Sequence, residues 1–281
     1  MTGVLCKLHL SKSGYYNYLH RKPSKQSISK KNRMQAIQTI YDDNHQIYGA
    51  PKIAKEMQKK GEKISQRTVG VYMREMGIKA CYIKPYVKTT FDSDFSTKLH
   101  NILKRDFSPN KPNEAWCTDI TYIFTLEGFV YLTSVMDLYS RKIISWVLSE
   151  TLEASHVVEC VEKAKRVRNV EKPLIFHCDR GCQYVSEAFQ KATKGMIHSY
   201  SKKAYPWDNA CIESFHALLK REWINRFKIF NYAHAHKLIF EYIETFYNTV
   251  RIHSHCGYLS PNEYEEQYLE NIEENAVKIA S

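Results

Sequence analysis

Three acidic residues occur in contexts where carboxylates could carry out chemistry on phosphodiesters. Asp119 lies in the segment WCTDITYIF, among strand-forming residues. Asp179 follows the apolar run 174–176, and Glu213 lies in a helical pattern for which Asp208 is the predicted N-cap. Three crowded carboxylates repel one another, and a bound cation removes that repulsion. We therefore predict that Asp119, Asp179 and Glu213 meet in space and hold divalent metal against DNA.

The chemistry expected of such a site is in-line displacement at phosphorus. Two divalent ions about 4 Å apart can activate the attacking oxygen and stabilise the leaving oxygen. Mg²⁺ prefers hard oxygen ligands and keeps several waters, so a few carboxylates suffice. We expect two Mg²⁺ ions, with Mn²⁺ as a substitute.

Basic side chains follow the second and third acids. Lys220 comes two helical turns after Glu213, so the two residues share one helix face. The expected DNA-contacting residues around it are Lys202, Lys203, Lys220 and Arg221, with Tyr205 and Trp207 packing against bases or sugars. The alternative is a solvated loop and a surface ion pair that contributes little.

Length and charge indicate a soluble protein with a polyanionic partner. The chain has 281 residues and a net charge of +11. Residues 1–90 contain 18 Lys and Arg against 5 Asp and Glu, whereas the remaining residues are about neutral. This asymmetry favours nucleic acid as the partner, although a basic surface can serve solubility alone. We expect a cytoplasmic protein, because the eight cysteines are scattered and no apolar run could span a bilayer.

The first third of the chain is predicted to be helical. Residues 1–33 are interpreted as a helical arm, with Ser11 or Ser13 as a cap, followed by a basic linker. Residues 34–80 have the pattern of a helix-turn-helix, a DNA-binding motif whose last helix begins after Ser65 and ends at Gly77. Side chains expected to enter a DNA groove are Arg67, Thr68, Tyr72 and Arg74. Small helical packings without DNA contact are the alternative.

The rest of the chain changes to an α/β pattern. Residues 81–112 are interpreted as a connector, aromatic and basic at 82–86, and residues 113–265 as the core. Three strands joined by short turns predict an antiparallel meander, and alternating helices and strands follow it. The segment 208–227 is predicted to be one helix, 232–250 another, and 266–281 a tail.

Several ordered motifs together resemble one known family. The motifs WCTDITYI, GFVYLTSVMDLYSRKIISW, HCDRGCQYVS, DNACIESFHALLKRE and YNTVRIHSHCGYLSPNEY resemble the catalytic part of insertion-sequence DDE transposases related to retroviral integrases. YGAPKI and ISQRTVGVYMREMGIKA resemble the helix-turn-helix that precedes it. The resemblance implies a ribonuclease-H-like mixed sheet with flanking helices, Mg²⁺ dependence, and DNA cleavage followed by strand transfer. It also implies that Asp119, Asp179 and Glu213 are the catalytic triad.

The resemblance brings further expectations and some departures. It implies double-stranded DNA as partner, both element ends and target, and a homo-multimer that joins two ends. It also implies a protein of the second reading frame, with a partner protein encoded upstream. The interval between Asp179 and Glu213 is two residues shorter than usual, and the shortfall falls around residues 193–199. Cys178 and Arg180 replace commoner small or amide residues.

Two other functions remain open from the sequence. One is a non-catalytic DNA-binding regulator derived from such a transposase, in which the acids are structural. The other is a zinc protein, whose candidate ligands are Cys178, Cys182, His253, His255 and Cys256, although no paired zinc-binding spacing occurs. His177 is expected to be a hydrogen-bonding residue at a strand end rather than a ligand.

Overall fold

A computed structural model describes residues 7, 11–20, 22–81, 99–170, 173–202 and 205–280, with the side chains of Pro206 and 276–280 excepted. The chain forms two compact units, residues 1–81 and 82–281. Each unit is described here by itself. None of the helices in the described ranges combines the length and apolar character needed to cross a membrane.

The first unit is entirely helical in its described residues. Its helices are α2 (Lys12–Leu19), α3 (Lys25–Asp43), α4 (Ala50–Lys59) and α5 (Gln66–Glu75). Ile53 of α4 and Val69 of α5 are fully buried, so α3, α4 and α5 pack around one small core. Ser11 caps α2 and Ser65 caps α5 through side-chain hydrogen bonds, as predicted.

One boundary in this unit was wrong. Residues 21–33 were predicted to be a linker, but α3 begins at Lys25. Ser24 is its N-cap and accepts a hydrogen bond from the Ser27 amide at 3.1 Å. Pro23 therefore precedes a helix cap, and the basic residues after it are compatible with a helix. The aromatic and basic stretch 82–86 lies outside the described residues.

A mixed five-stranded sheet forms the centre of the second unit. Its strands are β1 (Ala115–Thr125), β2 (Gly128–Asp137), β3 (Ile143–Ser149), β4 (Ile175–Cys178) and β5 (Ile197–Tyr200). The order is β3-β2-β1-β4-β5, with β1 antiparallel to β2 and parallel to β4. The predicted meander and the buried fourth strand are confirmed.

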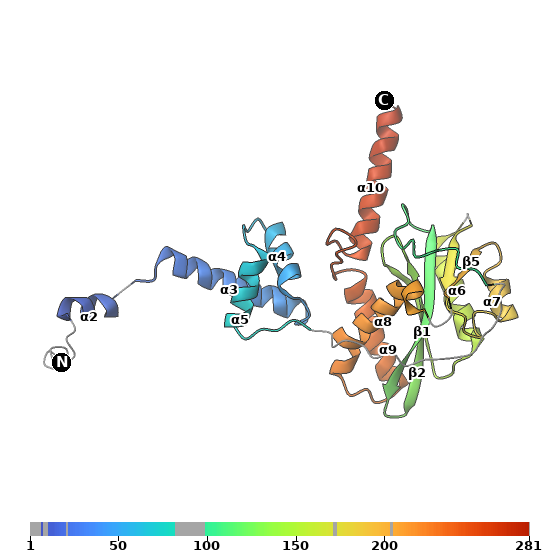
Figure 1. The fold of residues 1–281 in the computed structure, drawn as a ribbon, viewed down its shortest axis with the longest axis horizontal. Helices are drawn as coiled ribbons and strands as arrows, with labels where there is room; N and C mark the ends of the chain where they lie inside the picture. The colour runs from blue at the N-terminus through green and yellow to red at the C-terminus, as the bar shows by residue number, and fades with distance from the viewer. Residues whose placement is uncertain are drawn as a thin grey trace. The chain divides into compact units, whose positions relative to one another are not determined.

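Helices cover both faces of this sheet (Figure 1). On one face, α6 (Ala154–Arg168) and α7 (Glu187–Ala192) enclose a core that includes Trp116, Val135 and Phe176. On the other, α8 (Ala210–Glu222) and α9 (Tyr232–Phe240) contact β1. The mixed sheet with flanking helices is the predicted fold class.

Two helices differ from their predicted extents. A short 3₁₀ helix, Pro206–Asn209, precedes α8, and Asp208 is not the N-cap of α8. Its carboxylate instead accepts hydrogen bonds from the Lys202 amide at 2.9 Å and from Arg105 at 2.7 Å. Another short 3₁₀ helix, Ile224–Arg226, follows α8, and α9 continues as a π-helix, Glu241–Tyr247. The local sequence pattern resembles a continuous helix in both places. It does not show that Asp208 binds Arg105, which is 103 residues away.

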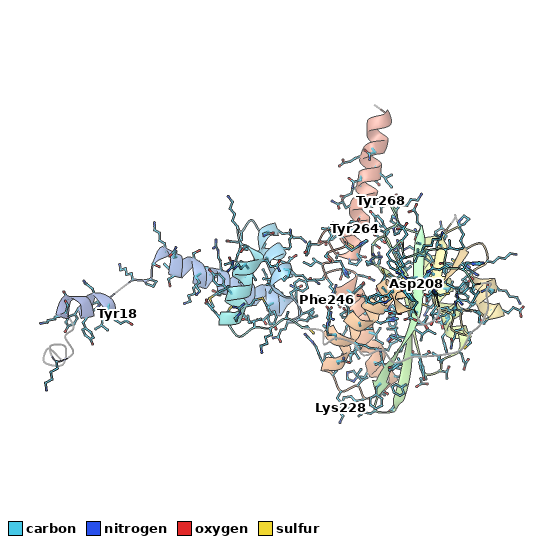
Figure 2. All side chains as sticks on the ribbon, viewed as in Figure 1. Tyr18, Asp208, Lys228, Phe246, Tyr264 and Tyr268 are labelled. Atoms are coloured by element: carbon cyan, nitrogen blue, oxygen red, sulfur yellow. The ribbon has the colours of Figure 1, made fainter. Side chains whose placement is uncertain are left out.

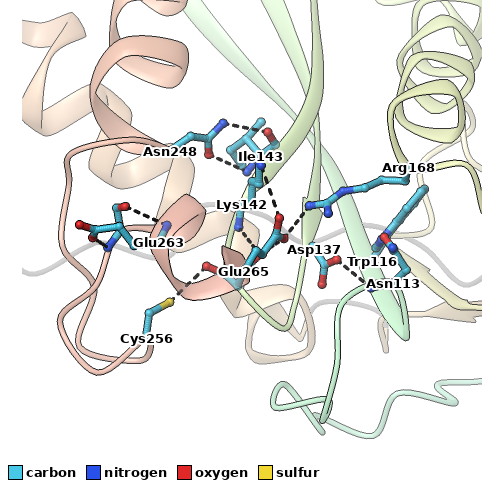
Figure 3. A network of polar contacts seen from close by, with 12 residues as sticks. Asn113, Trp116, Asp137, Lys142, Ile143, Arg168, Asn248, Cys256, Glu263 and Glu265 are labelled. Atoms are coloured by element: carbon cyan, nitrogen blue, oxygen red, sulfur yellow. Dashed lines mark hydrogen bonds and ion pairs between the residues drawn. The ribbon is translucent and has the colours of Figure 1, made fainter. Parts of the chain in front are cut away.

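The helix α10 (Pro261–Ala280) is attached through one buried carboxylate (Figure 3). Glu265 lies 2.6 Å from Arg168 of α6, 3.4 Å from Lys142, and accepts a hydrogen bond from Ser140. Burial opposes ionisation of Glu265, but the hydrogen bond and charge of Arg168 outweigh it and hold its pKa below the ordinary value. The first turns of α10 are therefore part of the core.

A second buried ion pair holds the end of α8. Both side-chain nitrogens of Arg251 that face Glu222 lie 2.7 Å from its carboxylate oxygens. The Tyr242 hydroxyl also donates to Glu222 at 2.7 Å. All three side chains are buried, so water cannot replace the hydrogen bonds of one side chain if its partners are removed.

We expect Arg251→Met to lower the free energy of unfolding of the second unit by about 3–5 kcal/mol, because it leaves Glu222 buried without its cation. Denaturant titration followed by tryptophan fluorescence measures this. The fluorescence reports on the second unit alone, since all tryptophans lie in it: Trp116, Trp146, Trp207 and Trp223. The matched control is Glu159→Gln, which removes the exposed pair with Lys163 and should change stability by less than about 0.5 kcal/mol. Equal effects of the two variants would contradict the role of the buried pair.

Candidate active site

Two of the predicted acids lie at matching positions of neighbouring strands. β1 and β4 run parallel, with Cys117 opposite His177. Continuing this register by two residues places Asp119 opposite Asp179, which directly follows β4. Adjacent strands are about 4.8 Å apart, and positions in register point to the same face. The parallel pairing thus sets the two carboxylates side by side.

The third acid is carried to this place by α8. The Asn209 side chain, just before the helix, donates to the Thr118 carbonyl at 3.2 Å, beside Asp119. Glu213 follows in the first turn of α8. The residue is exposed, but part of its carboxyl is desolvated by the protein, and the charges of Asp119 and Asp179 both act on it. Three separate elements therefore contribute carboxylates to one electrostatic neighbourhood.

The pKa values of Asp179 and Glu213 show that ionising these carboxyls is unfavourable in the site. Burial and the charge of Asp119 raise the pKa of Asp179 to about 6, against an opposing hydrogen bond from the Gly181 amide. Burial and the charges of Asp119 and Asp179 raise the pKa of Glu213 to about 7. Asp179 and Glu213 are thus harder to ionise, first because they are buried and then because Asp119 is charged. This is the environment in which cation binding is most favourable.

The carboxyl oxygens of the three acids are suitable ligands for a hard divalent cation, but the side chains are not arranged as a complete metal site. The three carboxyls offer oxygen atoms and excess negative charge, as Mg²⁺ and Mn²⁺ require. Across the described ranges, however, no group of three or more His, Cys, Asp or Glu side chains is arranged to hold a metal ion.

The backbone around Asp179 is fixed by local bonds. The Gly181 amide donates to Asp179 Oδ1 at 2.8 Å. A Cβ at position 181 would lie 3.0 Å from that same oxygen, so glycine permits the close approach. Arg180 donates to the carbonyls of Ser201 at 2.9 Å and Leu99 at 3.0 Å. The unusual arginine beside the second acid thus binds two neighbouring segments of the core.

His177, on β4, is a buried hydrogen-bonding residue, as predicted. Its ring nitrogens lie 2.8 Å from Ser199 Oγ and 3.0 Å from Ser201 Oγ. Burial lowers its pKa to about 4, although the charge of Asp208 opposes this. The histidine therefore links β4 to β5 in its neutral form.

Lys220 lies beside the acids on the same helix as Glu213. Its Nζ is 4.4 Å from the centre of the Tyr122 ring. Burial lowers its pKa, and the charge of Asp119 opposes that change. A half-buried ammonium between an aromatic ring and an acidic site is suited to meet a phosphate.

The other predicted DNA-contacting residues of this unit differ in their exposure and in the side chains they contact. Lys202 and Trp207 are exposed, and the Tyr205 ring lies 4.5 Å below the guanidinium of Arg105. Arg221 is half-buried, with Nη2 3.7 Å from Glu222. Lys203 lies outside the described residues. In the structure, Arg221 therefore faces a structural carboxylate as well as the surface.

The predicted recognition residues all lie on α5 of the first unit. Arg67 and Arg74 are exposed, whereas Tyr72 is half-buried, with Lys30 Nζ 5.5 Å from its ring centre. Thr68 shares a hydrogen bond of 2.9 Å with the Ser65 hydroxyl, so its hydroxyl also serves the helix cap. The two arginines are the side chains best placed to contact a phosphate or base.

The zinc alternative has no support from the geometry. The Cys256 thiol donates to the Ser140 carbonyl at 3.2 Å, and Cys178 contacts the Ser199 carbonyl in β5. Burial raises the pKa of Cys256 to about 12 and that of Cys178 well above its ordinary value. Zinc ligation needs thiolates, which these sites disfavour.

Sequence reasoning missed two residues, His216 beside Asp119 and Arg105 beside Asp208. His216 Nδ1 lies 3.4 Å from Asp119 Oδ2, and its Nε2 lies 3.3 Å from Ser134 Oγ. Its position three residues after Glu213 could have revealed it, since such residues share a helix face. Arg105 binds Asp208 from 103 positions away, and no local signal reveals that contact.

Comparison with known proteins shows matches along most of the chain. The family Integrase core domain matches residues 109–206 and, in a second description, 194–261; HTH-like domain matches 29–86. The transposase for insertion sequence element IS904 of Lactococcus lactis is 36% identical over 249 residues, covering 88% of this chain and 98% of the relative. The transposase InsF for insertion sequence IS3A of Escherichia coli is 32% identical, covering 95% and 94%.

A solved structure adds a distant likeness. The HTLV-2 integrase catalytic core domain, in complex with magnesium, aligns with a TM-score of 0.43 at 15% identity, covering 56% of this chain and 98% of that one. The family matches and the sheet described above are those of a ribonuclease-H-like core preceded by a helix-turn-helix region.

We expect Mg²⁺ to bind more tightly at about pH 8 than at about pH 6. Because the folded chain raises the pKa values of Asp179 and Glu213, it holds protons there that the cation must displace. In the metal-free chain, these two groups stabilise the fold progressively as pH falls through about 7 and 6. Calorimetric titration in two buffers of different ionisation enthalpy measures the affinity and the protons released.

The matched variants for this titration are Asp119→Asn and Glu187→Gln. The first removes a charge that raises both pKa values, so proton release and affinity should both fall. The second changes an exposed carboxylate of α7 and should alter neither. An affinity that is constant between the two pH values in the unaltered chain would contradict the coupling.

Proposed function

Because this chain belongs to the insertion-sequence transposases that carry an integrase core, we propose that Asp119, Asp179 and Glu213 are its catalytic carboxylates. The observation that carries this proposal is the convergence of the three acids, where burial and then the charge of Asp119 raise the pKa of Asp179 and of Glu213. They come from β1, the end of β4 and α8, and no other trio of acids in the core is coupled in this way among the shifts described. The regulator alternative is not favoured, since the family match extends through the catalytic core.

The enzyme is a polynucleotidyl transferase of the DDE type, acting on DNA. The proposed reaction is cleavage that exposes a 3′-hydroxyl, followed by attack of that hydroxyl on a second phosphodiester. Bound at the three carboxyls, two Mg²⁺ ions, or Mn²⁺ in their place, would supply Lewis acidity to the entering and leaving oxygens. The carboxyls fit this role by their oxygen donors and their unrelieved charge.

The chain's own residues would orient the carboxyls and the phosphate. His216 on α8 contacts Asp119 through Nδ1 and Ser134 through Nε2. The Gly181 amide donates a hydrogen bond to one carboxylate oxygen of Asp179. Lys220, on the same helix face as Glu213, would receive a phosphate oxygen next to the scissile bond. Placing these groups on a sheet and one helix limits the motion available to them.

The domain boundaries and partners are part of the same proposal. We propose residues 25–80 as the DNA-binding module, which starts where α3 starts, 81–112 as a connector, 113–265 as the catalytic core and 266–281 as a tail. Double-stranded DNA, at the element ends and the target, is the proposed substrate, and a homo-multimer would join two ends. An upstream-frame protein and a cytoplasmic setting complete the proposal; every cysteine in the described ranges is a free thiol, which suits a reducing compartment.

We expect Asp119→Asn, Asp179→Asn and Glu213→Gln each to reduce strand joining by at least about 100-fold, because each removes a charged oxygen donor at the reacting phosphate. The assay uses DNA flanking this gene as donor and a supercoiled plasmid as target, with Mg²⁺. Duplex binding should remain within about two-fold, which separates loss of chemistry from loss of the fold.

The control for this assay is Glu187→Gln, an exposed carboxylate outside the site. It should leave joining unchanged. Joining by Glu213→Gln at the rate of the unaltered chain would rule out the proposed triad.

We expect Arg67→Ala and Arg74→Ala each to weaken duplex binding several-fold and to reduce the salt dependence of log K by about one unit. Both side chains are exposed on α5, where a recognition helix would present them. Fluorescence anisotropy at several salt concentrations measures the slope. Lys191→Ala, on α7 of the other unit, is the matched control and should keep the original slope. Unchanged slopes in both arginine variants would exclude α5 as the contact surface.

A further inference from the structure

Three exposed aromatic rings share one face of the β1–β2 hairpin, beyond the part that α6 covers. Tyr122 and Phe124 of β1 are 61% and 64% exposed, and Phe129 of β2 is 52% exposed. The rings contact one another edge to face: Phe129 lies 5.6 Å from Tyr122 and 5.4 Å from Phe124, measured between ring centres. We call these three residues the hairpin platform.

The hairpin platform is not explained by the core. The neighbouring residues Ile123 and Thr125 point to the other face and are buried, so burial alternates regularly over residues 121–125 of β1. Trp116 of β1 points to the same face of the sheet as the hairpin platform and is buried in the core under α6. The three platform rings lie farther along the hairpin and are exposed. Rings of this size usually lie in a core or at an interface.

Positive charge surrounds the hairpin platform. Lys220 Nζ lies 4.4 Å from the Tyr122 ring centre. At the hairpin end, the Leu126 amide donates to the Ile229 carbonyl at 3.0 Å, which holds the adjoining segment with Lys228 against the turn (Figure 2). The turn itself carries one exposed acid, Glu127. Cations beside exposed rings favour a polyanion that also has flat, apolar faces.

The platform lies a short distance from the proposed reacting phosphate. Tyr122 is three residues after Asp119 on the same strand, so their Cα atoms are about 10 Å apart and their side chains point to opposite faces of the sheet. A nucleic-acid strand advances about 3.4 Å per nucleotide in a duplex, so a strand that passes round the edge of β1 from one side chain to the other spans at least about three nucleotides. Lys220 lies between the two places, since it contacts the Tyr122 ring and feels the charge of Asp119.

We propose that the hairpin platform stacks unpaired bases of the DNA strand that lies next to the active site. The proposal rests on the proposed function, because it places the scissile phosphate at Asp119. Stacking on aromatic side chains contributes about 1–3 kcal/mol per base and tolerates any base. The platform would thus hold a frayed DNA end in place without reading its sequence. A second copy of the chain could also cover apolar rings, but Lys220 and Lys228 favour DNA.

The test measures binding of the full chain to three fluorescent oligonucleotide duplexes in EDTA. One is blunt, one carries a three-nucleotide unpaired end, and one carries the same end with abasic sites. The unaltered chain should bind the base-bearing end at least about five-fold more tightly than the abasic end. The double variant Phe124→Ala and Phe129→Ala should lose this preference and keep its affinity for blunt duplex within about two-fold. A 2-aminopurine in the unpaired end should be quenched only by the unaltered chain.

The matched control is Phe240→Ala, which removes a 48% exposed ring of α9. It should retain the preference for bases over abasic sites, and tryptophan fluorescence melting should show that every variant folds. Equal affinity of the unaltered chain for base-bearing and abasic ends would overturn the proposal. So would a double variant that retains the preference but changes the oligomeric state in sedimentation, because the platform would then be a contact between copies. Since no metal is present, failure here is distinct from failure of the triad, which the joining assay reports.

Discussion

Like charges within β1 and just past the end of β4 repel one another, and the surrounding structure holds them together despite this. Parallel pairing of the two strands places Asp119 and Asp179 in register, and α8 adds Glu213. Burial and the charge of Asp119 raise the pKa of Asp179 and Glu213, so ionising these carboxyls is unfavourable here. A protein with no use for cations or phosphates would gain stability by replacing any one of these acids.

The helix α8 is held at both ends, and this explains how it resists that repulsion. At its start, Asn209 binds the β1 backbone; at its end, Glu222 forms the buried pair with Arg251. Between these two anchors lie the side chains that face the acidic site, Glu213, His216 and Lys220. Stability and the proposed activity thus depend on the same helix through different residues. The buried pair adds no atoms to the active site, but it maintains the direction of the helix that does.

Features that depend on residues close together in the sequence could be predicted, and features that depend on distant residues could not. The strand-turn-strand pattern of β1 and β2 and the caps at Ser11 and Ser65 depend on neighbours in the chain, so the sequence predicts them well. The three acids could be named because their strand and helix contexts, and the family motifs, are local. Asp208 was misassigned because its partner Arg105 is distant in sequence. The exposure of the hairpin platform could not be predicted either, since strand alternation does not show where α6 stops covering the sheet.

The π-helix Glu241–Tyr247 makes the chain unusually sensitive to length at this point. A π-turn accommodates one residue more than an α-turn, which is how both Tyr242 and Tyr247 come to be buried. Adding or removing a residue while the hydrogen-bond pattern stays the same would rotate everything that follows by about 100°. Asn248, whose amide pairs with both backbone groups of Ile143, and Arg251 would then point away from their partners. Substitutions in this segment should therefore be tolerated far better than insertions or deletions as such elements diverge.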